Sequence, residues 1–121
     1  MPEMQSRPTR PHLLRMKRTE SGYFLHLSIP EDLYYFDGHF PHMPIVAGVC
    51  QLKWVIDFIQ TYTGETLHIR ALENVKFLRP LFPGQSCVME LSYISQPASW
   101  HYEICTDTQR FASGSLLVKP A

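Results

Sequence analysis

Apolar residues are densest between Gly48 and Gln60, where their pattern predicts a buried helix. The stretch has no Pro and no internal Gly, and it is long enough for three to four helical turns. Its polar exceptions, Lys53, Asp57 and Gln60, are spaced so that they fall in one narrow stripe. Apolar side chains cover the rest of the circumference, which is typical of a buried helix. The apolar residues are Val49, Cys50, Leu52, Trp54, Val55, Ile56, Phe58 and Ile59.

The segment before this helix, residues 37–44, is predicted to be a rigid loop. Pro41 and Pro44 lack backbone donors and restrict the residues before them, while Gly38 permits a sharp bend. No Ser, Thr or Asn caps the helix start, and free amides there favour an anion or a polarised carbonyl. Because the loop also carries His39, the junction between loop and helix is predicted to be a functional site.

The rest of the chain consists of short runs typical of β-strands. Two strands are expected over residues 13–18 and 23–29, around a turn at residues 20–22. A long strand over residues 67–79 should bend near Glu73-Asn74, and three more are expected over residues 87–95, 99–107 and 111–118. Thr63-Gly64 should end the helix, and Pro83-Gly84 predicts a type II turn.

This combination of elements predicts an α+β domain with an antiparallel sheet wrapped around one long central helix. The short connections between successive strands favour antiparallel neighbours. Such a sheet leaves one edge and part of the helix open, and a partner subunit is the usual cover for such an edge.

Composition indicates one folded domain of 121 residues, 45% hydrophobic and 18% charged. We expect residues 1–12 to be a basic, partly disordered segment and residues 13–121 to form the domain. The formal net charge of zero disfavours nucleic acid as a partner. Positive charge nevertheless gathers near the start, which is interpreted either as a solvated terminus or as a basic margin that meets an acidic partner. The basic residues there are Arg7, Arg10, Arg15, Lys17 and Arg18.

The cysteine pattern and the hydropathy argue against a disulfide-rich protein, a zinc site and a membrane protein. Cys50, Cys87 and Cys105 are an odd number without a short Cys-x-x-Cys spacing, which argues against a disulfide framework and against a zinc site. All three are interpreted as small core residues, and no metal or cofactor is expected. No segment resembles a signal peptide or is apolar enough to span a membrane, so a cytoplasmic protein is expected.

Two blocks of the sequence resemble the hotdog-fold 3-hydroxyacyl-[acyl-carrier-protein] dehydratases. The first block is similar to the family pattern Gly-His-Phe-Pro-x-x-Pro-apolar-x-Pro-Gly-Val, and the second precedes Pro83-Gly84. The resemblance covers roughly residues 13–118 and is greatest to relatives in aryl-polyene pigment clusters. The two blocks are Gly38-His39-Phe40-Pro41-His42-Met43-Pro44-Ile45-Val46-Ala47-Gly48-Val49 and Asn74-Val75-Lys76-Phe77-Leu78-Arg79-Pro80.

The resemblance implies a single hotdog fold and a role for each block. His39 would transfer protons, and the amides of Gly48 and Val49 would point at a thioester carbonyl. The acyl thioester would be carried on acyl carrier protein or on CoA. The chain would form a homodimer or a higher homo-oligomer, or pair with another hotdog subunit, with sites at the interface. The residues expected to bind substrate are Gly38, Phe40, Pro41, Met43, Gly48, Val49 and Trp54.

Two positions depart from the family pattern. Ala47 stands where the family usually has Pro, and Lys53 stands where it has the catalytic carboxylate. Three interpretations of Lys53 are open: it donates the proton itself, it pairs with Asp57 and leaves the chemistry, or Asp57, about 6 Å further along the helix, replaces the acid.

The expected function is a dehydratase that forms 2-enoyl thioesters in fatty-acid or polyene biosynthesis. The alternatives are a non-catalytic or weakly active subunit that binds acyl chains or carrier protein, and a thioesterase. The other histidines lack ligand-like spacing and are interpreted as surface or packing residues: His12, His26, His42, His68 and His101.

Overall fold

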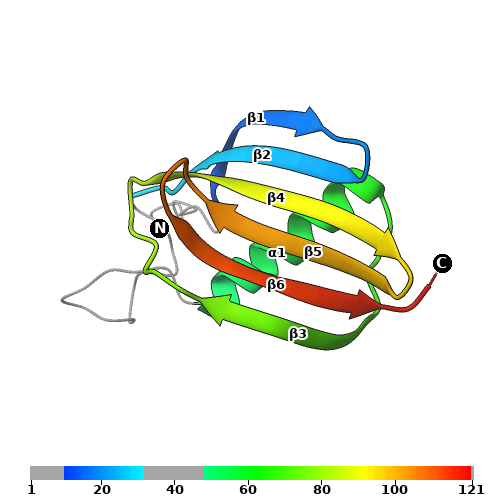
Figure 1. The fold of residues 1–121 in the computed structure, drawn as a ribbon. Helices are drawn as coiled ribbons and strands as arrows, with labels where there is room; N and C mark the ends of the chain where they lie inside the picture. The colour runs from blue at the N-terminus through cyan, green and yellow to red at the C-terminus, as the bar shows by residue number, and fades with distance from the viewer. Residues whose placement is uncertain (1–9, 32–47, 121) are drawn as a thin grey trace, which may run out of the picture.

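The computed structural model describes residues 10–31 and 48–120 of the chain. These ranges contain one helix and six strands (Figure 1). The predicted loop at residues 37–44 and the segment 1–9 lie outside the described residues. In chain order, the elements are β1 (His12–Arg18), β2 (Gly22–Ser28), α1 (Gly48–Thr63), β3 (Ile69–Phe77), β4 (Ser86–Ser95), β5 (Ala98–Cys105) and β6 (Arg110–Val118).

The six strands form one antiparallel sheet, and α1 crosses one of its faces (Figure 1). The strand order is β1-β2-β4-β5-β6-β3, so that β1 and β3 form the two edges. Along β2, β4 and β5, buried residues alternate with partly exposed ones, because successive side chains point to opposite faces. The arrangement confirms the expected α+β class and the single hotdog fold.

The strand order differs from the sequence prediction in one respect. Residues 67–79 and 87–95 were expected to be antiparallel neighbours, but β3 pairs with β6 while β4 pairs with β2. The connection after β3 carries the chain across the end of the sheet, with the Leu81 side chain fully buried. Two hydrogen bonds then hold it beside the end of β2, since Gly84 N donates to Ile29 O at 2.8 Å and Ile29 N donates to Gln85 O at 2.8 Å.

The core lies between α1 and the inner face of the sheet. Trp54, Val55 and Ile59 are at most 1% exposed, and each fully buried large apolar side chain contributes roughly 1.5–3 kcal/mol to folding. The helix is less buried than its sequence suggested, because Val49 is 74% exposed and Lys53 faces solvent. The sheet covers only one side of α1.

Three local predictions are confirmed. Gly64 follows the helix with φ of +74°, and its amide donates to Gln60 O at 2.9 Å, as in a left-handed helix C-terminus. Gly84 in the predicted turn has φ of +80°. The long strand β3 bends where expected, because Asn74 has φ of +54° and the register with β6 shifts between Glu73 and Lys76.

The two edge strands are exposed along nearly their whole length. Every residue of β1 is exposed, and β3 has only Val75 partly buried. Leu72 and Phe77, each 50% exposed, are large apolar side chains on the β3 edge. Within the described ranges, α1 is neither long enough nor apolar enough to span a membrane.

Candidate active site

The predicted site residues divide into two groups. Gly48, Val49, Lys53, Trp54 and Asp57 all lie on α1, which the structure describes. The residues of the predicted loop lie outside the described residues, and their roles remain predictions: Gly38, His39, Phe40, Pro41 and Met43. The geometry of the site is therefore that of the helix and the elements packed on it.

The start of α1 lies against the end of β3, so that the two sequence blocks meet. A Cβ atom placed on Gly48 would lie 2.6 Å from Cζ of Phe77 and 2.9 Å from its two Cε atoms. Real Cβ contacts are not that close, so a larger residue at position 48 would require the Phe77 ring or the helix start to move. Phe77 was not predicted to be a site residue, although the second sequence block contained it.

The first turn of α1 is suited to bind a negative or polarised group. It contains no acidic residue, so the positive end of the helix dipole is not compensated from within the turn. The first amides of an α-helix have no intrahelical acceptor. Val49 is exposed while Cys50 and Gln51 are buried, so one side of this turn faces solvent and the other packs inward.

Lys53 and Asp57 form an ion pair on the exposed side of α1. Lys53 Nζ lies 3.4 Å from Asp57 Oδ2, and the two side chains are 58% and 28% exposed. The pairing proposed from the i, i+4 spacing is therefore present, whereas the catalytic role of either residue remains a prediction. A pair this exposed contributes at most about 1 kcal/mol to stability.

Comparison with known proteins identifies the family. The model of the ApeI-like family, described as ApeI dehydratase, matches residues 15–115, which include both the second sequence block and all of α1. The chain belongs to the ApeI dehydratase family. This agrees with the resemblance seen in the two blocks and with the hotdog fold.

Curated relatives of the ApeI-family chain include enzymes named 3-hydroxyacyl-[acyl-carrier-protein] dehydratase FabZ. The one from Brucella ovis is 33% identical over 73 residues, which are 54% of this chain and 46% of the relative. The one from Nitrosomonas europaea is 27% identical over 108 residues, 77% of this chain and 69% of the relative. The chain thus spans about half the length of the Brucella relative that it matches.

Two solved structures share the fold. An uncharacterized protein from Erwinia carotovora subsp. atroseptica is 28% identical, with a TM-score of 0.74 over 92% of this chain and 97% of that one. A structure described as the dehydratase heterocomplex ApeI:P, from Xenorhabdus doucetiae, is 24% identical, with a TM-score of 0.78 over 90% of this chain and 97% of that one.

Trp54, one of the predicted substrate-binding residues, is buried. It is 1% exposed and packs in the core, so its predicted contact with an acyl chain remains a prediction.

A hollow of about 440 Å³ lies beside the end of α1 that is far from the helix start. Thr63, Tyr93 and Trp100 belong to its wall. It shares no residue with the predicted site.

The three cysteines, all in the described part of the chain, are not suited to act as nucleophiles. Burial raises the pKa of Cys50, although the nearby Lys53 charge acts in the opposite direction. Burial, with a smaller effect of Cys105, raises the pKa of Cys87 to about 12. Burial and then the neighbouring Glu90 raise the pKa of Cys105 to about 11. None of the three thiols is activated, since nucleophilic cysteines have a lowered pKa.

The prediction that Cys105 is a core residue is wrong. Cys105 is only partly buried and lies on the sheet face that points away from α1.

His101 agrees with its interpretation as a packing residue. Its Nδ1 lies 2.8 Å from Ser115 Oγ, and its Nε2 lies 3.2 Å from Ser99 Oγ.

Proposed function

We propose that this ApeI-family chain is a dehydratase that converts 3-hydroxyacyl thioesters to 2-enoyl thioesters. The observation that carries the proposal is the contact between Gly48 and Phe77, which joins the two sequence blocks at the uncompensated start of α1. A helix start of this kind can hold a thioester oxygen. The family match and the names of the FabZ relatives support the same reaction.

The reaction requires a base, an acid and stabilisation of the thioester oxygen. In the proposed mechanism, His39 takes the proton from C2, and the electron pair of that C–H bond forms the C2–C3 double bond. The C3–O bond breaks, and the hydroxyl leaves as water with a proton from the acid, for which Lys53 is the candidate and Asp57 the alternative. The amides of Gly48 and Val49 donate to the thioester oxygen, which carries negative charge in the transition state.

Within the described residues, the site lacks a well-placed proton donor for the C3 hydroxyl. The Lys53 side chain is 58% exposed, and its ammonium is paired with Asp57. A protonated lysine can donate a proton, but the ion pair holds it in the exposed stripe of α1. We therefore propose slow but measurable dehydration by the wild type.

A direct assay tests the function. The protein is incubated with 3-hydroxyacyl thioesters and with 2-enoyl thioesters, each on acyl carrier protein and on CoA, and ultraviolet absorbance of the enoyl product is followed. We expect interconversion in both directions without release of free thiol. Thiol release would instead indicate the thioesterase alternative. Binding of both thioesters without turnover would overturn the enzyme and leave a subunit that binds acyl chains.

We also propose that the chain works as an assembly of hotdog subunits. The β3 edge exposes Ile69, Leu72 and Phe77, and an exposed apolar edge strand normally pairs or is covered. Phe77 is also the residue that touches the helix start, so a subunit on this edge would lie beside the site. A second copy of the chain is the proposed partner, and the Xenorhabdus heterocomplex makes another hotdog subunit the alternative.

The proposal also includes a biosynthetic pathway and a carrier protein that delivers the acyl thioester. The resemblance of the two sequence blocks to relatives in aryl-polyene pigment clusters makes polyene biosynthesis the proposed pathway, with fatty-acid biosynthesis as the alternative. On the exposed β1 edge, Arg15, Lys17 and Arg18 are basic residues suited to an acidic carrier protein. This role of the basic margin remains a prediction.

Gly48→Ala is expected to lower kcat/KM roughly 100-fold while leaving the thermal midpoint close to that of the wild type. The new methyl group would overlap the Phe77 ring, and a displacement of about 1 Å at a reacting centre costs about that factor. Stability should change little, because the overlap lies at the sheet edge and Phe77 does not belong to the hydrophobic core, and because alanine is a better helix former than glycine. Enoyl formation and thermal unfolding are measured on the same preparations.

The double variant Gly48→Ala/Phe77→Ala is the matched control for that prediction. If overlap with the ring is the cause, removing the ring should restore part of the lost rate relative to Gly48→Ala alone. An unchanged kcat/KM in Gly48→Ala would show that the close approach at the helix start is not needed for the reaction.

A further inference from the structure

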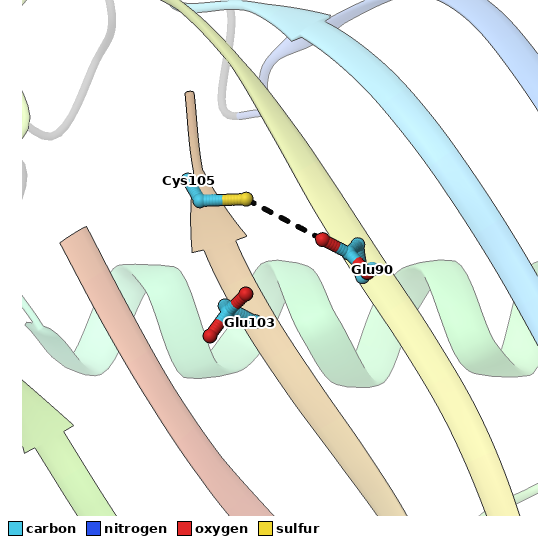
Figure 2. A group of neighbouring side chains, drawn as sticks. All are labelled: Glu90, Glu103 and Cys105. Atoms are coloured by element: carbon cyan, nitrogen blue, oxygen red, sulfur yellow. Dashed lines mark hydrogen bonds between the residues drawn. The ribbon is translucent and has the colours of Figure 1, made fainter. Parts of the chain in front are cut away.

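Three side chains with metal-binding atoms converge on the outer face of the sheet. Figure 2 shows Glu90 on β4 with Glu103 and Cys105 on β5, on the side of the sheet opposite α1. Glu90 and Glu103 are directly opposite each other in the β4–β5 register, and Cys105 follows two residues after Glu103 on the same face. One oxygen of each carboxylate and the cysteine sulfur all lie within 4.8 Å of one another. All three residues are partly buried.

The two carboxylates at this point of the sheet have different partners. Like charges directly opposite each other on paired strands are destabilising. Glu103 is compensated by Arg110, whose Nε lies 2.7 Å from Oε2 of Glu103. The Glu90 carboxylate instead accepts a hydrogen bond from the Cys105 thiol, at 3.5 Å between Sγ and Oε2. A thiol is a weak donor, so a cation would satisfy this carboxylate better.

The separation of the Cys105 sulfur from a Glu90 oxygen fits a zinc ion. With a Zn–S distance of about 2.3 Å and a Zn–O distance of about 2.1 Å, tetrahedral geometry places sulfur and oxygen about 3.6 Å apart. The observed separation of Cys105 Sγ and Glu90 Oε2 is 3.5 Å. A sulfur ligand favours zinc over calcium or magnesium, which take oxygen ligands.

The cluster is also open to an ion from solution. A hollow of about 430 Å³ adjoins it, and Glu90 and Cys105 belong to the wall of that hollow together with His26, Asp107 and the basic residues Arg15 and Lys17. A water molecule in the hollow can fill the fourth position of a tetrahedral site. The other oxygen of Glu103 can keep its bond to Arg110 while one oxygen binds the ion.

We propose that Glu90, Glu103 and Cys105 form a binding site for a zinc ion, which links β4 to β5 on the outer face of the sheet. The ion would neutralise the facing carboxylates and add a cross-strand link outside the core. The site lies on the opposite face from α1, so it is independent of the proposed dehydratase chemistry. The cysteine spacing gave no sign of it, because its ligands are brought together only by the register of two strands.

Cobalt(II) provides a sensitive probe, since it occupies zinc sites and absorbs strongly in the near ultraviolet when a thiolate is bound. Titration of the reduced protein with cobalt(II) is expected to give a thiolate charge-transfer band that saturates at one equivalent and disappears when zinc is added. Cys105→Ser should abolish the band. Glu90→Gln should weaken binding at least about tenfold, because loss of even an outer-shell partner costs that much.

Cys87→Ala is the matched control. Cys87 lies on β4 as Glu90 does, but its side chain is 5% exposed and belongs to the core between the sheet and α1, so the cobalt band should be retained. Zinc should also raise the thermal midpoint of the wild type and not that of Cys105→Ser. Circular dichroism verifies that each variant is folded. No band in the wild type at one equivalent of cobalt(II), or the same band in Cys105→Ser, would overturn the site.

Discussion

His39→Ala is expected to abolish dehydration of 3-hydroxyacyl thioesters, and Lys53→Glu is expected to increase it. A carboxylic acid facing the C3 hydroxyl supplies general-acid assistance worth roughly 100- to 10,000-fold. Lys53 is exposed and paired with Asp57 at 3.4 Å, so it is poorly placed to provide that assistance. Initial rates of enoyl formation are compared for the wild type, both single variants and the double variant. His39→Ala should remove activity in both backgrounds, because the base is needed whichever acid is present.

Two further variants separate the effect of the new acid from the loss of the ion pair. Lys53→Gln removes the positive charge and the pair without adding an acid, so it should not reproduce the gain of Lys53→Glu. Asp57→Asn releases Lys53 from its partner and should raise the rate only if lysine can serve as the acid. A fully active wild type whose rate falls in Lys53→Glu would show that lysine is the acid and that its presence is not a defect.

The local structure of this chain could be predicted from the sequence because it depends on short-range signals. Gly64 and Gly84 adopt the positive φ values that their positions after a helix and after a proline indicated. The bend at Asn74 was likewise visible in the length of the β3 segment. These features depend on the backbone preferences of a few neighbouring residues.

The strand order could not be predicted in the same way. It depends on where the connection after β3 runs, and that path is set by the burial of Leu81 and by the hydrogen bonds of Ile29 with Gly84 and Gln85. Such contacts join residues far apart in sequence and leave no periodic signal. The placement of Cys105 in the core was a different kind of error, because the alternation along β5 already puts Cys105 on the same face as His101 and Glu103.

The candidate site was only partly visible in the sequence. The block that contains Gly48 indicated a reactive helix start, and the block that contains Phe77 indicated a related strand. Their contact appears only when β3 is placed at the edge of the sheet beside the start of α1. The group formed by Glu90, Glu103 and Cys105 depends in the same way on the register between β4 and β5.

The double variant Ile69→Lys/Leu72→Lys is expected to be a folded monomer without dehydratase activity, whereas the wild type is expected to be the proposed dimer. Both side chains are large, apolar and exposed on the β3 edge, at 38% and 50%, so their replacement leaves the core of the subunit intact. Burial of such side chains contributes roughly 1.5–3 kcal/mol each, and a two-fold interface contains each of them twice. A loss of about 4 kcal/mol already weakens association roughly 1,000-fold. Light scattering measures the mass, and circular dichroism measures the fold.

Leu14→Lys is the matched control for this experiment, because Leu14 is an apolar residue, 62% exposed, on the opposite edge strand β1. It should leave both the mass and the activity unchanged. If the β3 variant has the molar mass of a monomer and keeps its activity, the site is complete within one subunit. A wild type that is monomeric at micromolar concentration would contradict the assembly itself. If the mass falls only in the β3 variant and activity falls with it, the edge that carries Phe77 to the start of α1 is also the edge that joins the subunits.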